Sequence, residues 1–460
     1  MKLILLSGGS GKRLWPLSND SRSKQFLKVL KGKNGHESMV QRVWNQIQNA
    51  GLSNDTLIAT SKSQVEMIQS QLNNKAELII EPNRRDTFPA IALASSYLYS
   101  IKNISLDETI VVLPVDPYVE DSFFTKITEL ESTFNRGNPN LALIGVKPTY
   151  PSSKYGYIIP KEKEFSKDKG TLTVEQFIEK PSEVVAKDLI DNGALWNCGV
   201  FSFKLRFLID ILKQKKIPTD YETLNLQYDE LPKISFDYEI VENAQNIVTL
   251  TYNGYWKDLG TWNTLTEEME TNIIGKGILS DDSSNSNLIN ELDIPVTVIG
   301  VPNAIVAVSP DGILVSDKEA SPRIKEFIGD FDNRPMYEER NWGYYRVLDY
   351  NKFKDGNEVL TKRIGISAGK NLSYHFHKLR SEIWTVIKGE GILALDGQLS
   401  SVKTGDVIQV KPGNYHSIKA ITDLEIIEVQ SGMEILDEDT IRLYLNWSEI
   451  EEECYSFTNK

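Results

Sequence analysis

A glycine-rich segment near the start of the chain carries the residue types that bind phosphate. The apolar run 3–6 leads into the segment 7–11, which contains three glycines, and the cations Arg13 and Lys24 follow. Because glycine has no Cβ, such a loop lets the backbone approach a ligand closely, and its N–H groups form an anion-binding concavity. Arg13 and Lys24 would add charge-assisted hydrogen bonds to the phosphates. The segment therefore predicts a phosphate cradle, with expected contacts at Leu6, Gly8, Gly9 and Gly11.

The spacing of this segment excludes the two standard nucleotide-binding loops. A Walker A loop needs Ser or Thr after its Gly-Lys pair, but Arg13 follows Lys12 here, and the earlier glycine is also missing. The dinucleotide motif G-x-G-x-x-G does not match either. The predicted cradle is therefore of another type.

A second set of residues, far along the chain, has the spacing of metal ligands. Three of the four histidines are His375, His377 and His416, and Glu382 lies between them. In a strand His375 and His377 face the same side, and we expect Glu382 and His416 to come from neighbouring strands. Three imidazoles and a carboxylate suit Zn²⁺, Mn²⁺, Co²⁺ or Fe²⁺, so a transition-metal site is predicted. The alternative is a chance scatter of histidines.

The elements that must position the first set follow from the hydrophobic pattern. Apolar strand-like runs at 56–60, 76–80, 109–114 and 141–146 alternate with helical patterns at 39–47 and 91–98. Such alternation predicts a mostly parallel sheet covered by helices, with ligands at the carboxyl ends of the strands. The glycine loop lies at one such end, and Asp116 lies at another.

The later part of the chain has a different pattern of apolar and turn-forming residues. Short strand-like pieces with polar turns occupy about 270–330, and strands punctuated by Gly and Pro run from 342 to about 441, which indicates an antiparallel barrel or sandwich. A chain of 460 residues also exceeds one ordinary core. We therefore predict an α/β domain at 1–270, a β-rich connector at 271–335 and an all-β domain at 336–460.

Composition narrows the class of protein. The net charge of −13 argues against a general affinity for nucleic acid or anionic membrane, so phosphorylated ligands would need local cations. The two cysteines, Cys198 and Cys454, are too few for a disulfide framework and favour a reducing compartment. No apolar stretch approaches the length of a membrane span. We expect a cytoplasmic protein.

The signature G-G-x-G-x-R-L-W-P-L-S at 8–18, followed by K-Q-F at 24–26, resembles the sugar-1-phosphate nucleotidylyltransferases, and the mannose-1-phosphate guanylyltransferase branch in particular. Ser23 stands where that family usually has Pro. The resemblance implies a Rossmann-like nucleotidyltransferase domain, a short β-helix-like connector, GTP and a hexose-1-phosphate as substrates, and a homodimer. It also implies four catalytic residues, of which the two aspartates bind Mg²⁺: Arg13, Lys24, Asp116 and Asp258.

Four further segments resemble this family in the same order along the chain. The segment 81–87 is similar to E-P-x-x-R-N-T, with Asp86 in place of Asn, and implies nucleotide contacts from Glu81 and Arg84. The other three are similar to Y-G-Y-I, F-x-E-K-P and W-N-S-G, the last with Cys198 in place of Ser. They imply a sugar-phosphate site formed by Gly156, Glu179, Lys180 and Asn197.

The C-terminal region resembles the cupin domain of type II mannose-6-phosphate isomerases, which is often fused to this transferase. Arg380-x-Glu382-x-Trp384 and Pro412-Gly413-x-x-His416 carry the likeness. It implies that His375, His377, Glu382 and His416 hold a transition metal and that Arg380 or Arg442 seats the phosphate of a hexose-6-phosphate. Glu428 is a possible base. The departures are His375 for Gln, and Lys378, Leu379, Ile383 and Leu445 at positions that are polar in that family.

Three hypotheses remain open at this stage. The leading one is an enzyme that makes GDP-mannose from GTP and mannose-1-phosphate, with possible isomerase activity in the cupin. The second keeps this chemistry but changes the hexose or the base, and leaves the cupin as a non-catalytic metal site. The third, a binding protein with a degenerate site, is opposed by the retained charges of Arg13, Lys24 and Asp258.

Overall fold

The computed structural model describes residues 1–9, 12–19, 22–33, 35–161, 171–328 and 334–458. The chain forms two compact units. The first comprises Met1–Leu288, Thr297–Val306 and Val315–Phe327, and the second comprises Ile289–Val296, Ala307–Leu314 and Ile328–Lys460. The predicted connector is divided between these units, and the boundaries at 270 and 335 stay a prediction.

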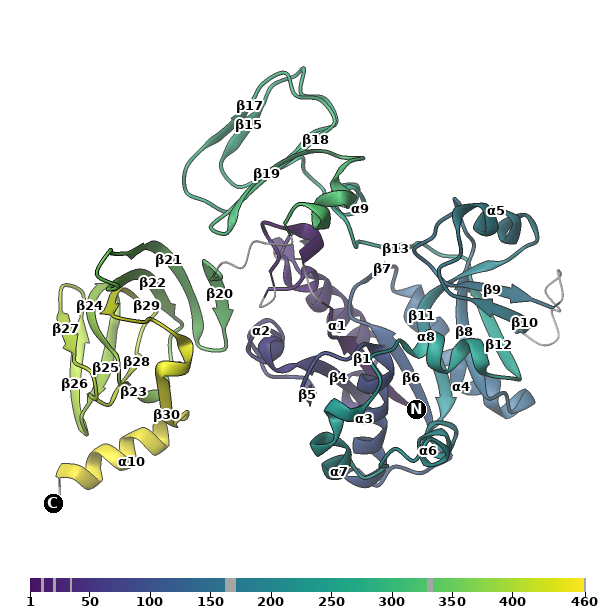
Figure 1. Cartoon of the computed structure of the whole chain (residues 1–460), viewed down its shortest axis with the longest axis horizontal. Coiled ribbons are helices and arrows are strands. Elements are labelled where there is room, and N and C mark those ends of the chain that lie inside the picture. Colours follow the sequence, from purple (N-terminus) through teal and green to yellow (C-terminus); the bar gives the residue numbers. More distant parts are fainter. Residues whose placement is uncertain (10–11, 20–21, 34, 162–170, 329–333, 459–460) are drawn as a thin grey trace. The chain divides into compact units, whose positions relative to one another are not determined.

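A large sheet forms the centre of the first unit (Figure 1). Its strands, in spatial order, are β5 (Glu77–Glu81), β4 (Thr56–Ser61), β1 (Lys2–Ser7), β6 (Thr109–Pro114), β11 (Leu195–Lys204), β8 (Leu141–Val146), β12 (Ile247–Tyr252), β10 (Leu172–Ile178) and β9 (Tyr157–Pro160).

Strand β1 shows why this sheet is covered on both faces. Its side chains alternate between two cores: Leu3 and Leu5 lie in one, and Ile4 lies in the other. Helices α1 (Met39–Asn49), α2 (Val65–Gln71) and α4 (Ser122–Gly137) pack in the first core, while α3 (Thr87–Ser100) and α6 (Leu205–Gln214) pack in the second. A strand buried on both faces reads as a continuous apolar run, as the sequence pattern predicted.

The sheet is parallel in its first half and mixed in its second. Strands β5, β4, β1 and β6 run parallel, which confirms the predicted strand–helix alternation. Strand β11 then runs antiparallel between β6 and β8, and β10 pairs antiparallel with β12 and β9. The carboxyl ends of β1 and β6 therefore lie together at one edge, where Gly8 and Asp116 follow them.

Smaller elements complete the first unit and the connector. The remaining helices are α5 (Glu183–Asp191), α7 (Tyr221–Leu226), α8 (Phe236–Glu239) and α9 (Trp262–Thr266), with short 3₁₀ helices η1 (Lys12–Leu14), η2 (Lys24–Phe26) and η7 (Ser321–Glu326). Two short antiparallel pairs are β2 (Leu30–Gly32) with β3 (Gly35–Glu37), and β7 (Pro117–Val119) with β13 (Trp256–Asp258). The connector strands are β14 (Ile273–Ile274), β15 (Gly277–Leu279), β16 (Asn287–Asn290), β17 (Val296–Val298), β18 (Ala304–Ser309) and β19 (Gly312–Asp317).

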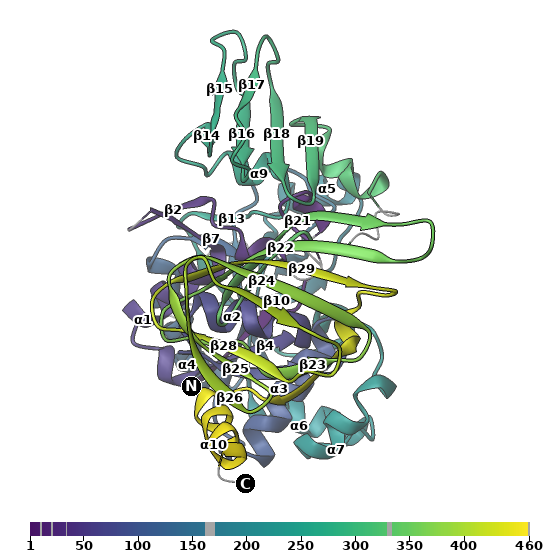
Figure 2. The same cartoon turned by 90° about the vertical axis from the view of Figure 1, so that its left-hand side faces the viewer.

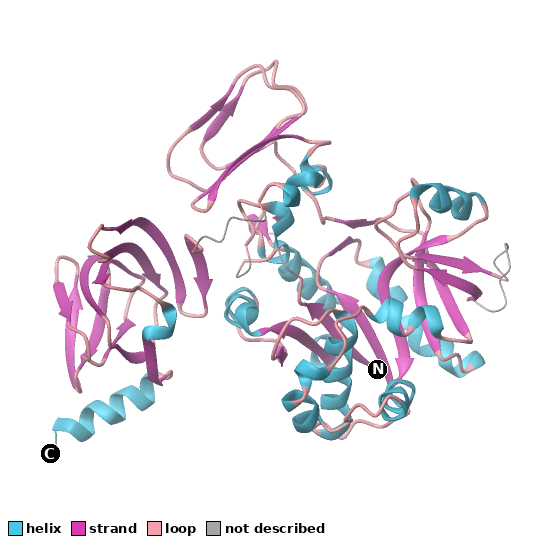
Figure 3. Cartoon of the chain, viewed as in Figure 1, coloured by secondary structure: helices cyan, strands magenta, loops and turns pink. Residues whose placement is uncertain are grey.

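The second unit consists mainly of strands, and helix α10 (Trp447–Thr458) follows them (Figure 3). One sheet contains β20 (Tyr337–Arg340), β21 (Gly343–Lys352), β22 (Glu358–Ile366), β29 (Leu424–Gly432), β24 (Arg380–Lys388) and β27 (Val407–Val410); β22, β29 and β24 run side by side (Figure 2). The other contains β26 (Gln398–Lys403), β25 (Glu390–Leu395), β28 (His416–Ala420), β23 (Tyr374–His377) and β30 (Thr440–Tyr444). An apolar core around Trp384 and Ile426 lies between the sheets, which confirms the predicted all-β domain.

Candidate functional site

Lys24 lies between Asp116 and Asp258, the two aspartates predicted to be catalytic together with it. The Lys24 Nζ is 2.8 Å from Asp116 Oδ2 and 3.1 Å from Asp258 Oδ1. Strand β6 ends just before Asp116, and the β7–β13 pair sets Asp258 opposite Pro117, so the fold brings the two carboxylates together. Burial works against the ammonium charge, but the two carboxylates outweigh it and raise the pKa of Lys24. Lys24 is therefore a permanent cation that holds two convergent carboxylates.

A strongly cationic cavity opens beside this triad. Its volume is about 500 Å³, and five of its lining side chains are cations, against one carboxylate from Asp86. Its lining residues are Gly8, Gly9, Arg13, Lys24, Arg84, Asp86, Lys233 and Lys325. Glycine backbone and an excess of positive charge suit a polyphosphate. The predicted contact Gly11 lies outside the described residues.

A second, smaller cavity shares the glycine loop. It measures about 310 Å³ and includes Leu6, Gly8, Glu81 and Arg84 among its lining residues, so the structure brings these predicted nucleotide contacts together. A Cβ at Gly8 would lie 3.2 Å from Glu81 Oε1, a tight contact that glycine avoids. Glu81 is buried, and the Tyr228 hydroxyl donates to its Oε2 at 2.7 Å. Burial raises the pKa of Glu81.

Asp86 caps a helix and also borders both cavities. It lies directly before α3, and its Oδ1 accepts a hydrogen bond from the Thr87 N–H at 2.8 Å. Its φ of +71° is a conformation that non-glycine residues rarely adopt. Backbone strain of this kind persists only where the surroundings hold it in place. Asp86 is thus both a helix cap and a wall of the nucleotide cavities.

The four predicted sugar-phosphate residues also come together. A Cβ at Gly156 would fall 2.5 Å from Glu179 Oε2, and Asn197 N–H donates to the Gly156 carbonyl at 2.8 Å. Lys180 Nζ lies 2.6 Å from Glu179 Oε1. The Asn197 amide donates to Asp237 Oδ1 at 3.0 Å, and Asp237 lines the smaller cavity. Burial, with Glu179 nearby, raises the pKa of Asp237 to about 7.

Cys198, which stands where the family has Ser, lies in the core and not in the site. In this core it lies with Ile144, and its Sγ donates to the Ile144 carbonyl at 3.1 Å. Burial raises the pKa of the Cys198 thiol to about 12, so it stays protonated. The exchange of Ser for Cys at this position therefore alters core packing and not the ligand surface.

Several residues of these cavities were not predicted from the sequence. Lys233 and Lys325 line the larger cavity, and Asp237 lines the smaller one. Lys325 falls in the predicted β-rich connector, for which no ligand contact was expected, and Lys233 and Asp237 carry no glycine or paired-charge signal. Only the fold brings them to the glycine loop.

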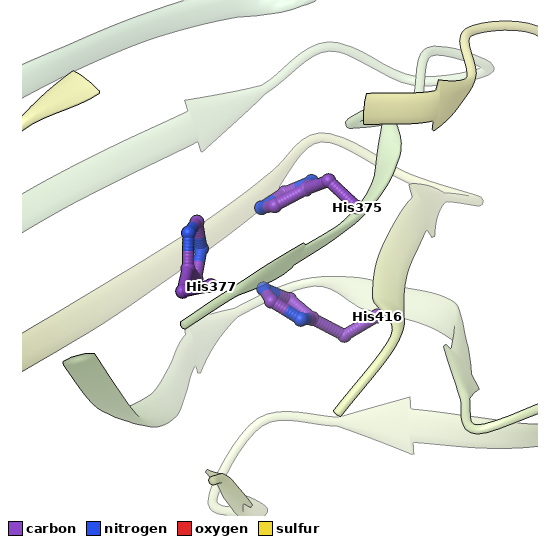
Figure 4. A group of neighbouring side chains, drawn as sticks. All are labelled: His375, His377 and His416. Carbon is purple, nitrogen blue, oxygen red and sulfur yellow. The ribbon is translucent and has the colours of Figure 1, made fainter. Parts of the chain in front are cut away.

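The three histidines of the second unit point toward one another (Figure 4). Their ligand nitrogens all lie within 4.8 Å, which confirms the predicted cluster. The Nδ1 atoms of His375 and His416 lie 2.7 and 3.0 Å from the backbone carbonyls of Ser373 and Asn414. Because Nδ1 then carries the proton, each Nε2 keeps its lone pair for a metal. Among the described residues, the buried Nε2 of His416 accepts or donates no hydrogen bond. This donor set fits a transition-metal ion.

Glu382 joins this cluster from a different direction than expected. We predicted that it would come from a neighbouring strand, and that is wrong: His375 on β23 pairs with His416 on β28, whereas Glu382 lies on β24 of the other sheet. Its carboxylate oxygens lie 3.1 Å from His377 Nε2 and 3.4 Å from His416 Nε2. Burial opposes the charge on Glu382, but the imidazoles beside it hold its pKa well below the usual range. The site thus forms between the two sheets.

The two predicted phosphate-binding arginines, Arg380 and Arg442, differ in burial. Arg380 is buried, and it donates from Nε to Glu382 Oε1 at 3.1 Å and from Nη1 to the Leu436 carbonyl at 2.8 Å. Arg442 lies opposite His375 on β30, and its side chain is exposed. Arg380 therefore orients Glu382. Arg442 is the cation that a ligand beside His375 could reach.

Glu428 lies beside Glu382 in the barrel interior. The Trp384 Nε1 donates to both carboxylates, at 3.0 and 3.1 Å, and the Gln430 amide does the same at 3.0 and 2.8 Å. Burial, with Glu382 adjacent, raises the pKa of Glu428 to about 8. Glu428 can thus hold a proton next to the histidine cluster at neutral pH.

Comparison with known proteins matches both units. The family model for nucleotidyl transferase matches residues 2–273, and the model for mannose-6-phosphate isomerase C-terminal matches residues 333–444. A mannose-1-phosphate guanylyltransferase of Salmonella montevideo is 27% identical over 95% of this chain and 98% of its own length. The alginate biosynthesis protein AlgA of Pseudomonas fluorescens is 28% identical over 95% of each chain.

Among solved structures, a Thermus thermophilus protein described as a mannose-1-phosphate geranyltransferase superposes with a TM-score of 0.60 at 26% identity. It covers 72% of this chain and 100% of its own. The family model for nucleotidyl transferase spans more than half of the chain. The chain belongs to the nucleotidyl transferase family and carries a mannose-6-phosphate isomerase-type C-terminal domain.

Proposed function

We propose that this enzyme forms GDP-mannose and pyrophosphate from GTP and α-D-mannose-1-phosphate. The observation that carries the proposal is the position of Lys24 between Asp116 and Asp258, in the lining of a cation-rich cavity. Relatives that match nearly the full length of the chain are named as mannose-1-phosphate guanylyltransferases, which supports mannose as the hexose and guanine as the base.

The chain's own residues would align the two substrates. Arg13 and the backbone of Gly8 and Gly9 would bind the triphosphate, because they line the larger cavity. Glu179 and Asn197 would accept and donate hydrogen bonds at the sugar hydroxyls, and Lys180 would bind the sugar phosphate. A phosphate oxygen of mannose-1-phosphate then attacks the α-phosphorus in line, and the bond to the β-phosphate breaks. Fixed positive charge stabilises the transferring group.

Asp116 and Asp258 fit a Mg²⁺ ion, since their carboxylates converge on one point, now marked by Lys24 Nζ. When held by these two carboxylates, Mg²⁺ would neutralise charge on the phosphates. Lys24 keeps the two carboxylates aligned and adds a positive charge of its own.

A matrix of substrates tests this proposal. Pyrophosphate release is measured for four nucleoside triphosphates, each with several hexose-1-phosphates, for the wild type and Asp258→Asn. The proposal predicts that GTP with mannose-1-phosphate gives the highest kcat/KM and that the variant loses it. A better pair would support the same chemistry on another hexose or base, and no release with any pair would overturn the proposal.

We propose a second activity, the interconversion of fructose-6-phosphate and mannose-6-phosphate, in the C-terminal unit. The observation that favours it is a carboxyl group able to hold a proton, Glu428, which shares the donors Trp384 and Gln430 with Glu382, the carboxylate beside the histidines. The bound metal would polarise the sugar carbonyl. Glu428 would carry the proton between adjacent carbons, and Arg442 would bind the phosphate. A coupled assay on metal-loaded protein tests it, and a cupin without isomerase activity under Zn²⁺, Mn²⁺, Co²⁺ or Fe²⁺ would be structural.

We further propose that the enzyme acts in the cytoplasm as a homodimer. Both cysteines are buried and free, as fits a reducing compartment. In the part of the chain that the structure describes, no helix has the length and apolar character to cross a membrane. Sedimentation velocity at micromolar concentration would test the dimer, and a monomer there would contradict it.

A further inference from the structure

Three cations of the larger cavity have no counter-ion. Lys24 is neutralised by Asp116 and Asp258, but Arg13, Lys233 and Lys325 form no ion pair with any residue in the described ranges. Positive side chains gathered in one cavity repel one another. All three side chains are exposed, so water screens part of this repulsion, but an anion that enters the cavity meets three positive charges that no carboxylate of the described residues pairs with.

Lys325 reaches this cavity from a short helix that is firmly anchored. It lies on η7, whose residues Ser321 and Ile324 are buried. The Ser321 hydroxyl donates to the Lys318 carbonyl at 2.7 Å, and η7 packs against both η1 and α9. Helix η1 carries Arg13, so the fold sets these two cations side by side.

Electrostatics places Lys325 on the Arg13 side of the cavity. Burial lowers the pKa of Lys325, and the charge of Arg13 lowers it further. Lys24 instead lies against the two aspartates, where the α-phosphorus must be for transfer. The β- and γ-phosphates would therefore extend away from Lys24 toward Arg13 and Lys325.

We propose that Lys325, together with Lys233, binds the β- and γ-phosphates of the nucleoside triphosphate and hence the pyrophosphate product. This rests on the proposed transferase function. In the forward reaction the bond from the α-phosphorus to the bridging oxygen breaks, and its electron pair stays on that oxygen. The negative charge gained by the leaving pyrophosphate then falls next to Lys325. The segment Val315–Phe327 would in this way supply a residue of the active site and not only a connection.

Substitutions on η7 itself separate this role from a structural one. Lys325→Met removes the charge and keeps most of the length, and Lys325→Arg keeps the charge. Arg323→Met is the matched control, because Arg323 lies on the same helix, pairs with Glu326 and does not line the cavity. Lys233→Met tests the second cation. Circular dichroism and the thermal transition would verify that each variant is folded.

The readouts are the KM for inorganic pyrophosphate in the reverse reaction with GDP-mannose, and the KM for mannose-1-phosphate in the forward reaction. Loss of a hydrogen bond to a charged group should raise the pyrophosphate KM by roughly 10- to 100-fold in Lys325→Met. Lys325→Arg should keep most of the affinity, Arg323→Met should match the wild type, and the KM for mannose-1-phosphate should stay within about twofold. Equal effects of Lys325→Met and Arg323→Met would overturn the proposal.

Direct titration of pyrophosphate into the protein keeps the two proposals distinguishable. If the wild type turns over no substrate pair but binds pyrophosphate, and Lys325→Met weakens that binding, the transferase assignment fails and the anion site stands. If the wild type turns over GTP and Lys325→Met binds pyrophosphate as tightly as the wild type, the role of Lys325 fails alone.

Discussion

Gly156 lies so close to Glu179 that a Cβ at position 156 would fall 2.5 Å from the carboxylate oxygen Oε2. Any larger residue must displace Glu179, which also holds Lys180 at 2.6 Å. The glycine therefore fixes the position of the sugar-facing carboxylate.

Gly156→Ala should raise the KM for the sugar phosphate and leave the KM for GTP nearly unchanged. The reason is that the added methyl group pushes Glu179 from its place, while the glycine loop at Gly8 is untouched. Steady-state kinetics with each substrate varied in turn would check this. Gly193→Ala is the control, because a Cβ there meets nothing within 4 Å, although its φ of +84° adds some backbone strain. Equal changes in both KM values for Gly156→Ala would contradict the account.

Lys24→Met should increase the stabilisation that Mg²⁺ gives to the folded chain. Without the ammonium group, Asp116 and Asp258 face each other as two carboxylates, and a divalent cation relieves their repulsion. The shift of Tm on adding Mg²⁺ should therefore be larger in Lys24→Met than in the wild type. Lys28→Met, at a neighbouring exposed lysine, serves as the control. An equal Mg²⁺ shift in all three proteins would show that the aspartates do not bind the ion.

Asp237 should make the folded state less stable as the pH rises toward neutrality. Burial and the nearby Glu179 raise its pKa from 3.8 to about 7, so between these values the folded state holds a proton that the unfolded state has lost. The stability from this group is complete below about pH 4 and is lost as the pH rises through 7. Asp237→Asn should flatten the fall of Tm across this range. The exposed Asp188→Asn should keep the wild-type slope, and a Tm profile of Asp237→Asn identical to the wild type would refute the assignment.

Transition-metal content should depend on the histidine cluster and not on the histidine outside it. The full-length chain, reconstituted and desalted, should hold one transition-metal ion per chain, and His375→Ala with His416→Ala should remove it. His36→Ala is the matched control, because this fourth histidine is exposed on β3, in the other unit. Elemental analysis gives the count. Full occupancy in the double variant would exclude the predicted ligands.

The sequence was sufficient where chemistry and spacing occur together. The glycine loop with Arg13 and Lys24 predicted a phosphate site, and the strand–helix alternation predicted where Asp116 would lie. The sequence was insufficient to predict contacts between residues that come together only through long-range packing. Lys325 comes from the predicted connector, and no local pattern shows that η7 packs against η1.

Sheet topology shows the same limit. Local periodicity predicts strands, but it carries no information on which strands pair. The insertion of β11 between β6 and β8 and the place of Glu382 on the second sheet of its unit both depend on pairing across long stretches of chain. In both cases the sequence predicted the strands or the ligand residue, but not the sheet or the neighbouring strand to which they belong.

The most direct test of the central claim is pyrophosphate release from GTP and mannose-1-phosphate by the wild type, Lys24→Met and Asp258→Asn under saturating Mg²⁺. The wild type should release pyrophosphate rapidly, and each variant should lose roughly 10²-fold or more in kcat/KM, the scale of losing one preorganised electrostatic contact. Wild-type rates in both folded variants would contradict the account, because the triad of Lys24, Asp116 and Asp258 would then play no part in the reaction.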